Sequence, residues 1–207
     1  MQARIAAFEN RDTSRVDELV QLVRDRQSTA EEKIPDALGM YMLVDRAAGT
    51  AMGISIFESE EAIDAAEPLF ERMGDEIPAE LRGRRISVDR YEVAIHEVSD
   101  GATAARVSTF SGDPASFDQD IRHAVEEVLP EVRAIDGWTG ILVLVDRDAG
   151  TQKTVTLWES VDALTTSERQ ADELRARAAE QAHGRIVSVE RYEVALAFDR
   201  APTLIVR

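Results

Sequence analysis

The sequence contains no cysteine, only two lysines and no long apolar run. Without cysteine the chain has no disulfide, no thiolate metal site and no cysteine nucleophile. A membrane-spanning helix needs about 20 consecutive apolar residues, and no stretch comes near that length, so we expect no membrane partner. The segment 1–8 carries one arginine and lacks a long apolar core, so we expect no signal peptide and a cytoplasmic location.

Positive charge is scarce as well, with 24 Lys and Arg residues against 40 Asp and Glu residues and a formal net charge of −16. The arginines are scattered among acids, whereas proteins that bind nucleic acid gather basic side chains on one face. We therefore expect no nucleic-acid partner. The hydrophobic content of 44% suffices for a core, and 207 residues allow one large domain or two small ones.

The two halves of the sequence repeat each other. Leu43 begins an eight-residue block, Leu-Val-Asp-Arg-Ala-Ala-Gly-Thr, that returns with one substitution at Leu144, and a second block at Ser87 returns at Ser188. Both blocks are offset by the same 101 residues. One constant offset across separated blocks indicates a tandem duplication. We assign residues 1–100 to the first repeat and 101–207 to the second repeat with a C-terminal tail.

Each repeat predicts the order strand, helix, strand, strand, helix, strand. The helices are indicated by apolar residues at helical spacing, and the middle strands by alternation around a turn of the type Asp-Arg-x-Ala-Gly. Ser59 and Ser160 are expected to cap the second helix of each repeat, and Pro68 is expected to bend or break that helix in the first repeat. The predicted strands are 4–8, 40–44, 52–57 and 88–95, with counterparts at 106–110, 141–145, 154–158 and 189–196.

This order predicts an α+β fold of two ferredoxin-like repeats, each an antiparallel sheet with both helices on one face. Ile54 and Ile56 alternate with Ser55 and Phe57, so large apolar side chains occur on both faces of the strand. The face without helices therefore needs a cover, which the second repeat can supply. We expect the two sheets to form one intramolecular barrel with helices outside; the alternative is two independent ferredoxin-like domains.

The run Gly-x-x-x-Leu-Val-Asp-Arg-x-Ala-Gly-Thr, followed by a strand that ends in Phe57-Glu58-Ser59 or Trp158-Glu159-Ser160, resembles the dimeric α/β-barrel superfamily. Within it, the chain is similar to the antibiotic biosynthesis monooxygenase-like proteins. The resemblance implies a barrel that usually forms from two identical chains. Here both halves are fused, so we expect a monomeric pseudo-dimer or a dimer of it. Because the superfamily includes monooxygenases, haem degraders, isomerases and proteins of no known activity, the resemblance implies the fold better than the activity.

In the haem-degrading members, the resemblance implies an Asn after the first strand and a Trp and a His on the second helix. Asn10 matches the first position, but the other two fall near Ala66 and Glu76. In the second repeat, Gly112 and Ser167 stand near the Asn and Trp positions. Haem is therefore disfavoured, since iron without an axial His would need another ligand. We expect no cofactor.

The candidate site residues, apart from Asn10, recur at equivalent positions of both repeats. Asn10, the only asparagine, could hold a substrate or an oxygen intermediate, or serve a turn. Four aromatic residues could line a ligand pocket or serve packing alone: Phe57, Trp158, Tyr91 and Tyr192.

An Arg and a Glu share one strand face in each repeat, opposite the tyrosine: Arg90 with Glu92, and Arg191 with Glu193. Such a pair could anchor a substrate carboxylate or enol, with Glu as general base, or form an ordinary ion pair. These four residues and Asn10 are the catalytic candidates.

We expect no metal site. None of the three histidines, His96, His123 and His183, has a spacing typical of a zinc site. The run Asp146-x-Asp148-x-Gly150 resembles the start of a calcium loop, but nothing continues the pattern, so we interpret it as a hairpin turn.

Three hypotheses for the function follow. The first is cofactor-free oxidation of a small apolar aromatic or quinone-like substrate in a pocket between sheet and helices. The second is a non-catalytic small-molecule-binding or stress-related barrel protein. The third is that one half has kept a pocket while the other serves as scaffold.

Overall fold

A computed structural model describes residues 1–9, 13–26 and 32–205 of the chain. It divides into two compact units. Unit 1 comprises residues 1–91 and 193–201, and unit 2 comprises residues 92–192 and the C-terminal segment from residue 202. The strand that ends each repeat therefore begins in one unit and finishes in the other. Asn10 lies outside the described residues.

The predicted order of elements occurs twice. The first half contains β1 (Gln2–Glu9), η1 (Thr13–Arg15), α1 (Val16–Asp25), β2 (Gly39–Asp45), β3 (Thr50–Phe57), α3 (Glu60–Asp75) and β4 (Arg84–Val98). The second half contains β5 (Ala104–Ser111), η2 (Pro114–Ser116), α4 (Phe117–His123), the π-helical η3 (Ala124–Val128), α5 (Leu129–Arg133), β6 (Trp138–Asp146), β7 (Thr151–Trp158), α6 (Val161–Thr166), α7 (Glu168–Gln181) and β8 (Arg185–Asp199), followed by β9 (Leu204–Ile205).

The strands pair in the order β1-β3-β2-β8-β5-β7-β6-β4-β9, and β1 also pairs with β4. The order of eight strands is thus closed, which is the connectivity of an antiparallel barrel of the α+β class and confirms the predicted fold. Strand β8 pairs with β2 through residues of unit 1, and β4 pairs with β6 through residues of unit 2. Because these strands are shared, the alternative of two independent domains is wrong. The tail adds β9 beside β4, where Ile205 faces Ile95.

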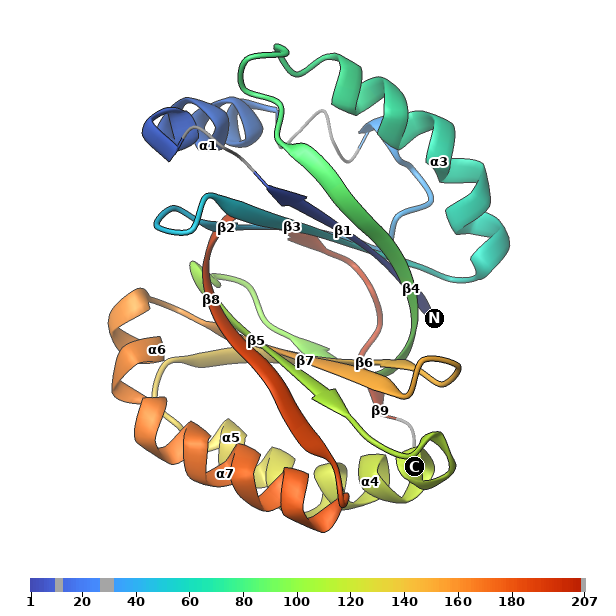
Figure 1. Ribbon diagram of the computed structural model, residues 1–207, viewed down its shortest axis with the longest axis vertical. Helices are drawn as coiled ribbons and strands as arrows, with labels where there is room; N and C mark the ends of the chain where they lie inside the picture. Colours follow the sequence, from blue (N-terminus) through green and yellow to red (C-terminus); the bar gives the residue numbers. More distant parts are fainter. Residues whose placement is uncertain (10–12, 27–31, 206–207) are drawn as a thin grey trace. The chain divides into compact units, whose positions relative to one another are not determined.

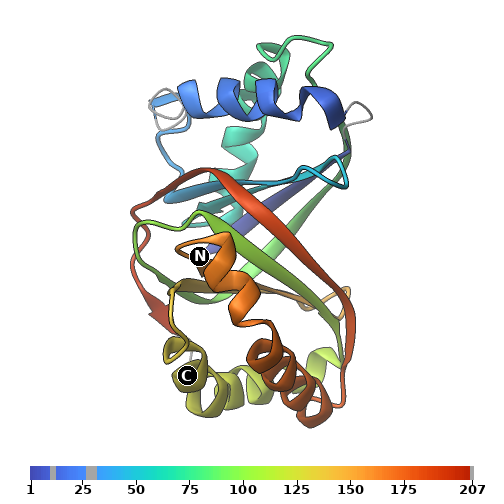
Figure 2. The same cartoon turned by 90° about the vertical axis from the view of Figure 1, so that its left-hand side faces the viewer.

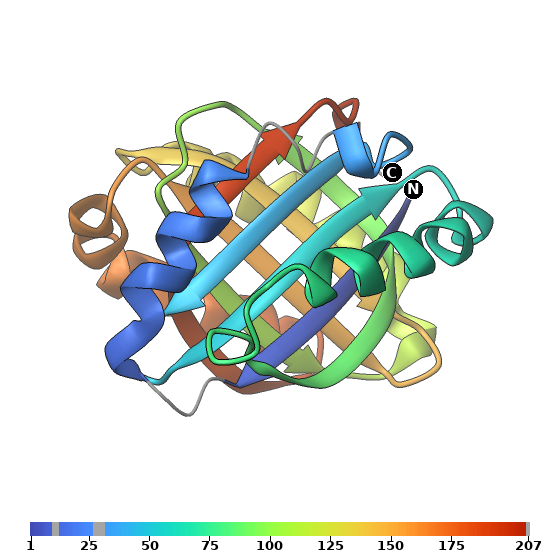
Figure 3. The ribbon, with the colours of Figure 1, turned by 90° about the horizontal axis from the view of Figure 1, so that it is seen from above.

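In unit 1, α1 and α3 lie across one face of the sheet formed by β1, β3 and β2 (Figures 1 and 3). The side chains of Ile63 and Ala66 on α3 pack against Phe57, which is completely buried. Helix α3 continues through Pro68 without a break, because residues on both sides of the proline, including Phe70, pack on the same core. Of the bend or break predicted at Pro68, the break does not occur.

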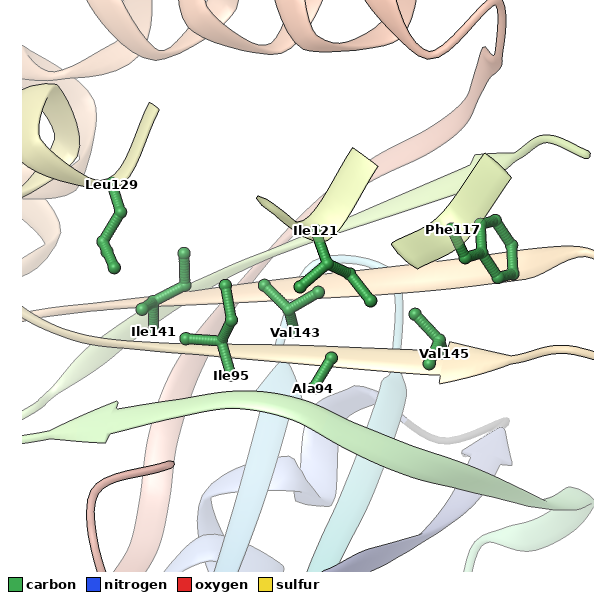
Figure 4. Packing of buried hydrophobic residues seen from close by; sticks show 8 residues of the cluster. All are labelled: Ala94, Ile95, Phe117, Ile121, Leu129, Ile141, Val143 and Val145. Carbon is green, nitrogen blue, oxygen red and sulfur yellow. The ribbon is translucent and has the colours of Figure 1, made fainter. Parts of the chain in front are cut away.

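In unit 2, α4, α5 and α7 lie on one face of the strands (Figure 2). Figure 4 shows Leu129 and Ile121 of the helices pointing toward Ile141 and Val143 of β6, while Phe117 lies nearest to Val145. The second helix of this half is divided at Ser167 into α6 and α7. Ser59 and Ser160 cap their helices as predicted, each accepting a backbone hydrogen bond three residues on. None of the helices that the structure describes is long and apolar enough to cross a membrane.

Candidate functional site

Unit 1 contains a cavity of about 370 Å³ between its sheet and its helices. Pockets for small molecules have volumes of about 300 to 1,000 Å³, so this cavity has the size of a ligand site. Side chains on the helix-facing side of the strands form its floor, and α1 and α3 form its walls. The floor includes Arg4, Phe8, Ala51, Gly53 and Ser55.

Unit 2 contains a cavity at the equivalent place, with a volume of about 120 Å³. An engineered cavity of about 150 Å³ holds one benzene molecule, so this space is of one-ring size. Its floor carries Gln152, Thr154 and Thr156 where unit 1 has Ala51, Gly53 and Ser55. These larger side chains occupy space that is open in unit 1, and they account for part of the difference in volume.

A buried arginine lies in the floor of each cavity at the same place in the fold. Arg4 on β1 is the register partner of Ser55, and Arg106 on β5 is the register partner of Thr156. Their side chains therefore project from the helix-facing side of the sheet, with residue exposures of 3% and 1%. A buried guanidinium is costly unless it is paired. Its partners therefore decide what each arginine can do.

Arg4 is paired through a two-point contact. Its Nε and Nη2 donate to the two carboxylate oxygens of Glu67 on α3 at 2.8 and 2.9 Å, the geometry of the stronger arginine–carboxylate pairs. The guanidinium carbon lies 4.2 Å from the ring centroid of Phe70. The hydrogen bond from Arg4 holds the pKa of Glu67 below its ordinary value. Unit 1 thus has a wide cavity whose buried charge is already neutralised.

Arg106 is paired through one nitrogen. Its Nη2 donates to the Leu164 carbonyl at 2.8 Å, to Ser167 Oγ at 3.0 Å and to Glu168 Oε2 at 3.1 Å. Nε and Nη1 are buried and have no hydrogen-bond partner among the residues that the structure describes. Burial lowers the pKa of the guanidinium, and the charge of Glu168 opposes that shift. The ring centroid of Trp158 lies 5.3 Å from the guanidinium carbon.

The predicted Arg–Glu pairs of the last strands bind other residues. Arg90 donates to Asp64 at 2.6 Å, and Glu92 accepts from Arg147 Nε at 2.7 Å. Within the described linings, neither cavity includes Arg90 or Glu92. Their catalytic role stays a prediction.

The second pair is separated in the same way. Arg191 Nε donates to Glu168 at 2.7 Å, and Glu193 accepts from Arg46 at 2.5 Å and from Arg24 at 2.6 Å. The hydrogen bond from Arg46 lowers the pKa of Glu193. Arg191 and Glu193 are also absent from the described linings of the cavities, and their catalytic role likewise stays a prediction.

Of the four aromatic candidates, Trp158 lines a cavity. Its indole Nε1 donates to Thr156 Oγ1 at 3.1 Å. Phe57 packs in the core of unit 1, with its ring edge-on to Phe70 and the centroids 6.2 Å apart. Tyr91 and Tyr192 are buried, and the described cavity linings do not include them.

Sequence reasoning missed the two buried arginines. Each stands between apolar residues on the first strand of its half, in Ala3-Arg4-Ile5 and Ala105-Arg106-Val107. A lone charge inside an apolar strand, present in both halves, was the available signal. It indicates a cation that the fold must pair or use.

The chain offers no histidine for an iron in the larger cavity, within the lining that the structure describes. His123 lines the smaller cavity and lies 3.2 Å from Glu127, but a space of about 120 Å³ is too small for a porphyrin. Across the described ranges, no group of three or more His, Asp or Glu side chains is arranged to hold a metal ion. The residues present do not fit a histidine-ligated haem.

No protein-family model matches the chain. The uncharacterised protein Rv2557 of Mycobacterium tuberculosis is 30% identical over 188 residues, which cover 88% of this chain and 83% of that protein. A candidate monooxygenase from Fusobacterium nucleatum superposes with a TM-score of 0.72 at 13% identity, covering 100% of this chain and 97% of that one. An anthrone oxidase-like protein superposes with a TM-score of 0.64 at 14% identity, covering 99% and 95%.

The relative fixes the family, and the solved structures fix the fold. The likeness of the solved structures over nearly the whole chain agrees with the closed strand order. The chain therefore belongs to the family of the mycobacterial protein Rv2557, and it shares the fold of these solved α/β-barrel structures.

Proposed function

We propose that this protein binds a small apolar aromatic or quinone-like molecule in the cavity of unit 1 and oxidises it with O₂ without a resident cofactor. The observation that carries the proposal is the cavity itself, which has about 370 Å³ of space and a mainly apolar lining. Arg4, Ser55 and Thr50 supply polar groups within that lining. The likeness in fold to a candidate monooxygenase and to an anthrone oxidase-like protein supports the reaction class.

The chemistry requires a substrate that forms a stabilised carbanion, such as an activated methylene next to a carbonyl. The methylene releases a proton, and the resulting enolate passes electrons to O₂. One oxygen atom becomes the new carbonyl oxygen, and the other leaves as water with the two hydrogens. The protein contributes exclusion of water and orientation. Arg4 places a positive charge in the cavity floor, where it can favour the enolate over the neutral ketone.

The test is oxygen consumption with anthrone and with 2-indanone, which both carry an activated methylene, measured with an oxygen electrode and by the absorbance of the product. We expect oxidation faster than the reaction without protein. The variant Gly53→Thr places in unit 1 the side chain that unit 2 carries at Thr154, and should slow turnover by closing the floor. Thr154→Ser in unit 2 is the matched control and should leave turnover unchanged. Equal rates with and without the protein for both substrates would overturn the proposal.

A non-catalytic binding protein is the second candidate, and one observation favours it. The positive charge of Arg4 is already neutralised by Glu67, and the four described catalytic candidates lie in ion pairs apart from the cavity linings. The same experiment separates the two functions. A binder would hold anthrone with micromolar or better affinity, measured by calorimetry, and would not accelerate oxygen uptake.

A further inference from the structure

The ion pairs that surround the buried arginine differ between the two units by one carboxylate. Arg4, Glu67 and Arg90 of unit 1 correspond to Arg106, Glu168 and Arg191 of unit 2. A fourth position, which carries an acid in unit 1, differs in unit 2. Asp64 of unit 1 is an acid, whereas the residue 101 positions later is Thr165.

In unit 1 each arginine has its own acid. Glu67 takes both hydrogen bonds from Arg4, and Asp64 accepts from Arg90 at 2.6 Å. Two positive charges therefore face two negative ones. This balance lets Glu67 turn both oxygens to the buried guanidinium.

In unit 2 one acid serves both arginines. Oε1 of Glu168 accepts from Arg191, and Oε2 accepts from Arg106. Thr165 provides no charge, and its hydroxyl donates to the Val161 carbonyl. Consequently Arg106 keeps a one-point contact, and its Nε and Nη1 have no partner among the described residues although the side chain is 1% exposed. Buried donors in this state are normally satisfied by a water molecule, an ion or a ligand.

The surroundings specify what would satisfy them. Arg106 lines the cavity of about 120 Å³, together with apolar side chains such as Ile121, Leu174 and Trp158. A guanidinium with two donors that lack a partner favours a carboxylate, which accepts charge-assisted hydrogen bonds. The apolar remainder, close in volume to a cavity that holds one benzene ring, favours a body of one ring.

We propose that the cavity of unit 2 is a binding site for a small carboxylic acid with an apolar body of about one ring, whose carboxylate binds Arg106. The ligand supplies the negative charge that Asp64 supplies in unit 1. This site is separate from the cavity in which we place oxidation, so it stands whether or not the protein turns over a substrate.

Tryptophan fluorescence provides the measurement. The chain has two tryptophans, Trp138 and Trp158, both in unit 2, and Trp158 lies beside the Arg106 guanidinium. Titration with benzoate should change the emission and saturate. Benzamide has nearly the same shape without the charge and should bind about ten-fold more weakly or worse, as expected for loss of a hydrogen bond to a charged group. Equal affinities for the two compounds, or no saturable response to benzoate, would overturn the proposal.

Two variants test the role of the charge. Arg106→Gln should abolish the response to benzoate. Thr165→Asp, at an exposed position, introduces the acid that unit 1 has at Asp64. The new carboxylate should bind Arg191, so that Glu168 can pair with Arg106 alone. The affinity for benzoate should then fall about ten-fold or more. Thr166→Asp adds the same charge at the neighbouring exposed position and should leave binding unchanged. Wild-type affinity in the well-folded Thr165→Asp variant would contradict the assignment.

Discussion

The two units have the same arrangement of strands and helices but contain different cavities. Unit 1 has space but a neutralised cation, and unit 2 has a cation with spare donors but little space. The differences come from few positions, chiefly three floor residues and the exchange of Asp64 for Thr165. The strand register and the buried arginine are common to both. The comparison teaches that volume and charge of a pocket can change independently when the sheet that carries them is kept.

The largest expected effect concerns the buried aromatic residues that end β3 and β7. Phe57→Ala and Trp158→Ala should each lower the free energy of unfolding by about 3 to 5 kcal/mol, because each leaves a cavity in a closed core. Urea unfolding measures both. Val161→Ala, at an exposed position, is the control and should change stability by less than about 0.5 kcal/mol. A small effect of one aromatic variant alone would show that the two units do not share a structural frame.

Removal of the two buried arginines should change stability by different amounts. Arg4→Met strips Glu67 of its partner and should destabilise the protein by about 2 kcal/mol. Arg106→Met removes an incompletely paired buried charge, while Glu168 keeps Arg191, so stability should change by less than about 1 kcal/mol or rise. Thermal unfolding at pH 7 without added anions makes the comparison. Equal losses would mean that Arg106 is as well paired as Arg4.

Acid should weaken unit 1 through Glu67. Its folded-state pKa is lowered, first by the hydrogen bond from Arg4. Its contribution is therefore present above the ordinary carboxyl pKa and is lost as the pH falls through the folded value. In Glu67→Gln the stability deficit should be full near pH 7 and should shrink as the solution is acidified below the ordinary value. A deficit that stays constant down to strongly acidic pH would show that the charge of Glu67 is not what the variant removes.

The smallest effect is expected at the surface ion pair that distinguishes the units. Asp64→Thr should cost, and Thr165→Asp should gain, about 0.2 to 1 kcal/mol, as is usual for exposed pairs. Both changes should diminish in high salt, because salt screens exposed charges. A double variant that exchanges the two residues should restore nearly the wild-type stability. A salt-independent effect would point to packing instead of charge.

The sequence predicted the order of strands and helices better than it predicted the candidate site. Alternation and the constant offset located the strands. They also identified the turns: Asp146 Oδ1 accepts from the backbone N–H groups of Asp148 and Ala149, so the calcium-like run is a hairpin turn as interpreted. The sequence pattern could not predict which residues bind Arg90 and Glu92. Sharing a strand face does not make two residues partners, and their acid or base comes from distant segments.

The sequence pattern could not predict the volumes of the cavities, for another reason. Their volumes depend on the summed size of side chains from several strands and helices, such as Gly53 against Thr154. The sequence also gives no local signal that β4 and β8 each begin in one unit and end in the other, because this depends on the strands with which each long strand pairs. Periodicity along one strand carries neither kind of information.

The pairing of β2 with β8 has a consequence for the order in which the protein is made. Residues 39–44 find their partners at 193–199, near the other end of the chain. During synthesis, the sheet of unit 1 lacks β8 until residues 193–199 have emerged, while β1, β2 and β3 can already pair. Contacts so distant in sequence also slow folding, because a long loop must close before they form. The nascent chain therefore carries an open sheet edge until β8 emerges and closes it.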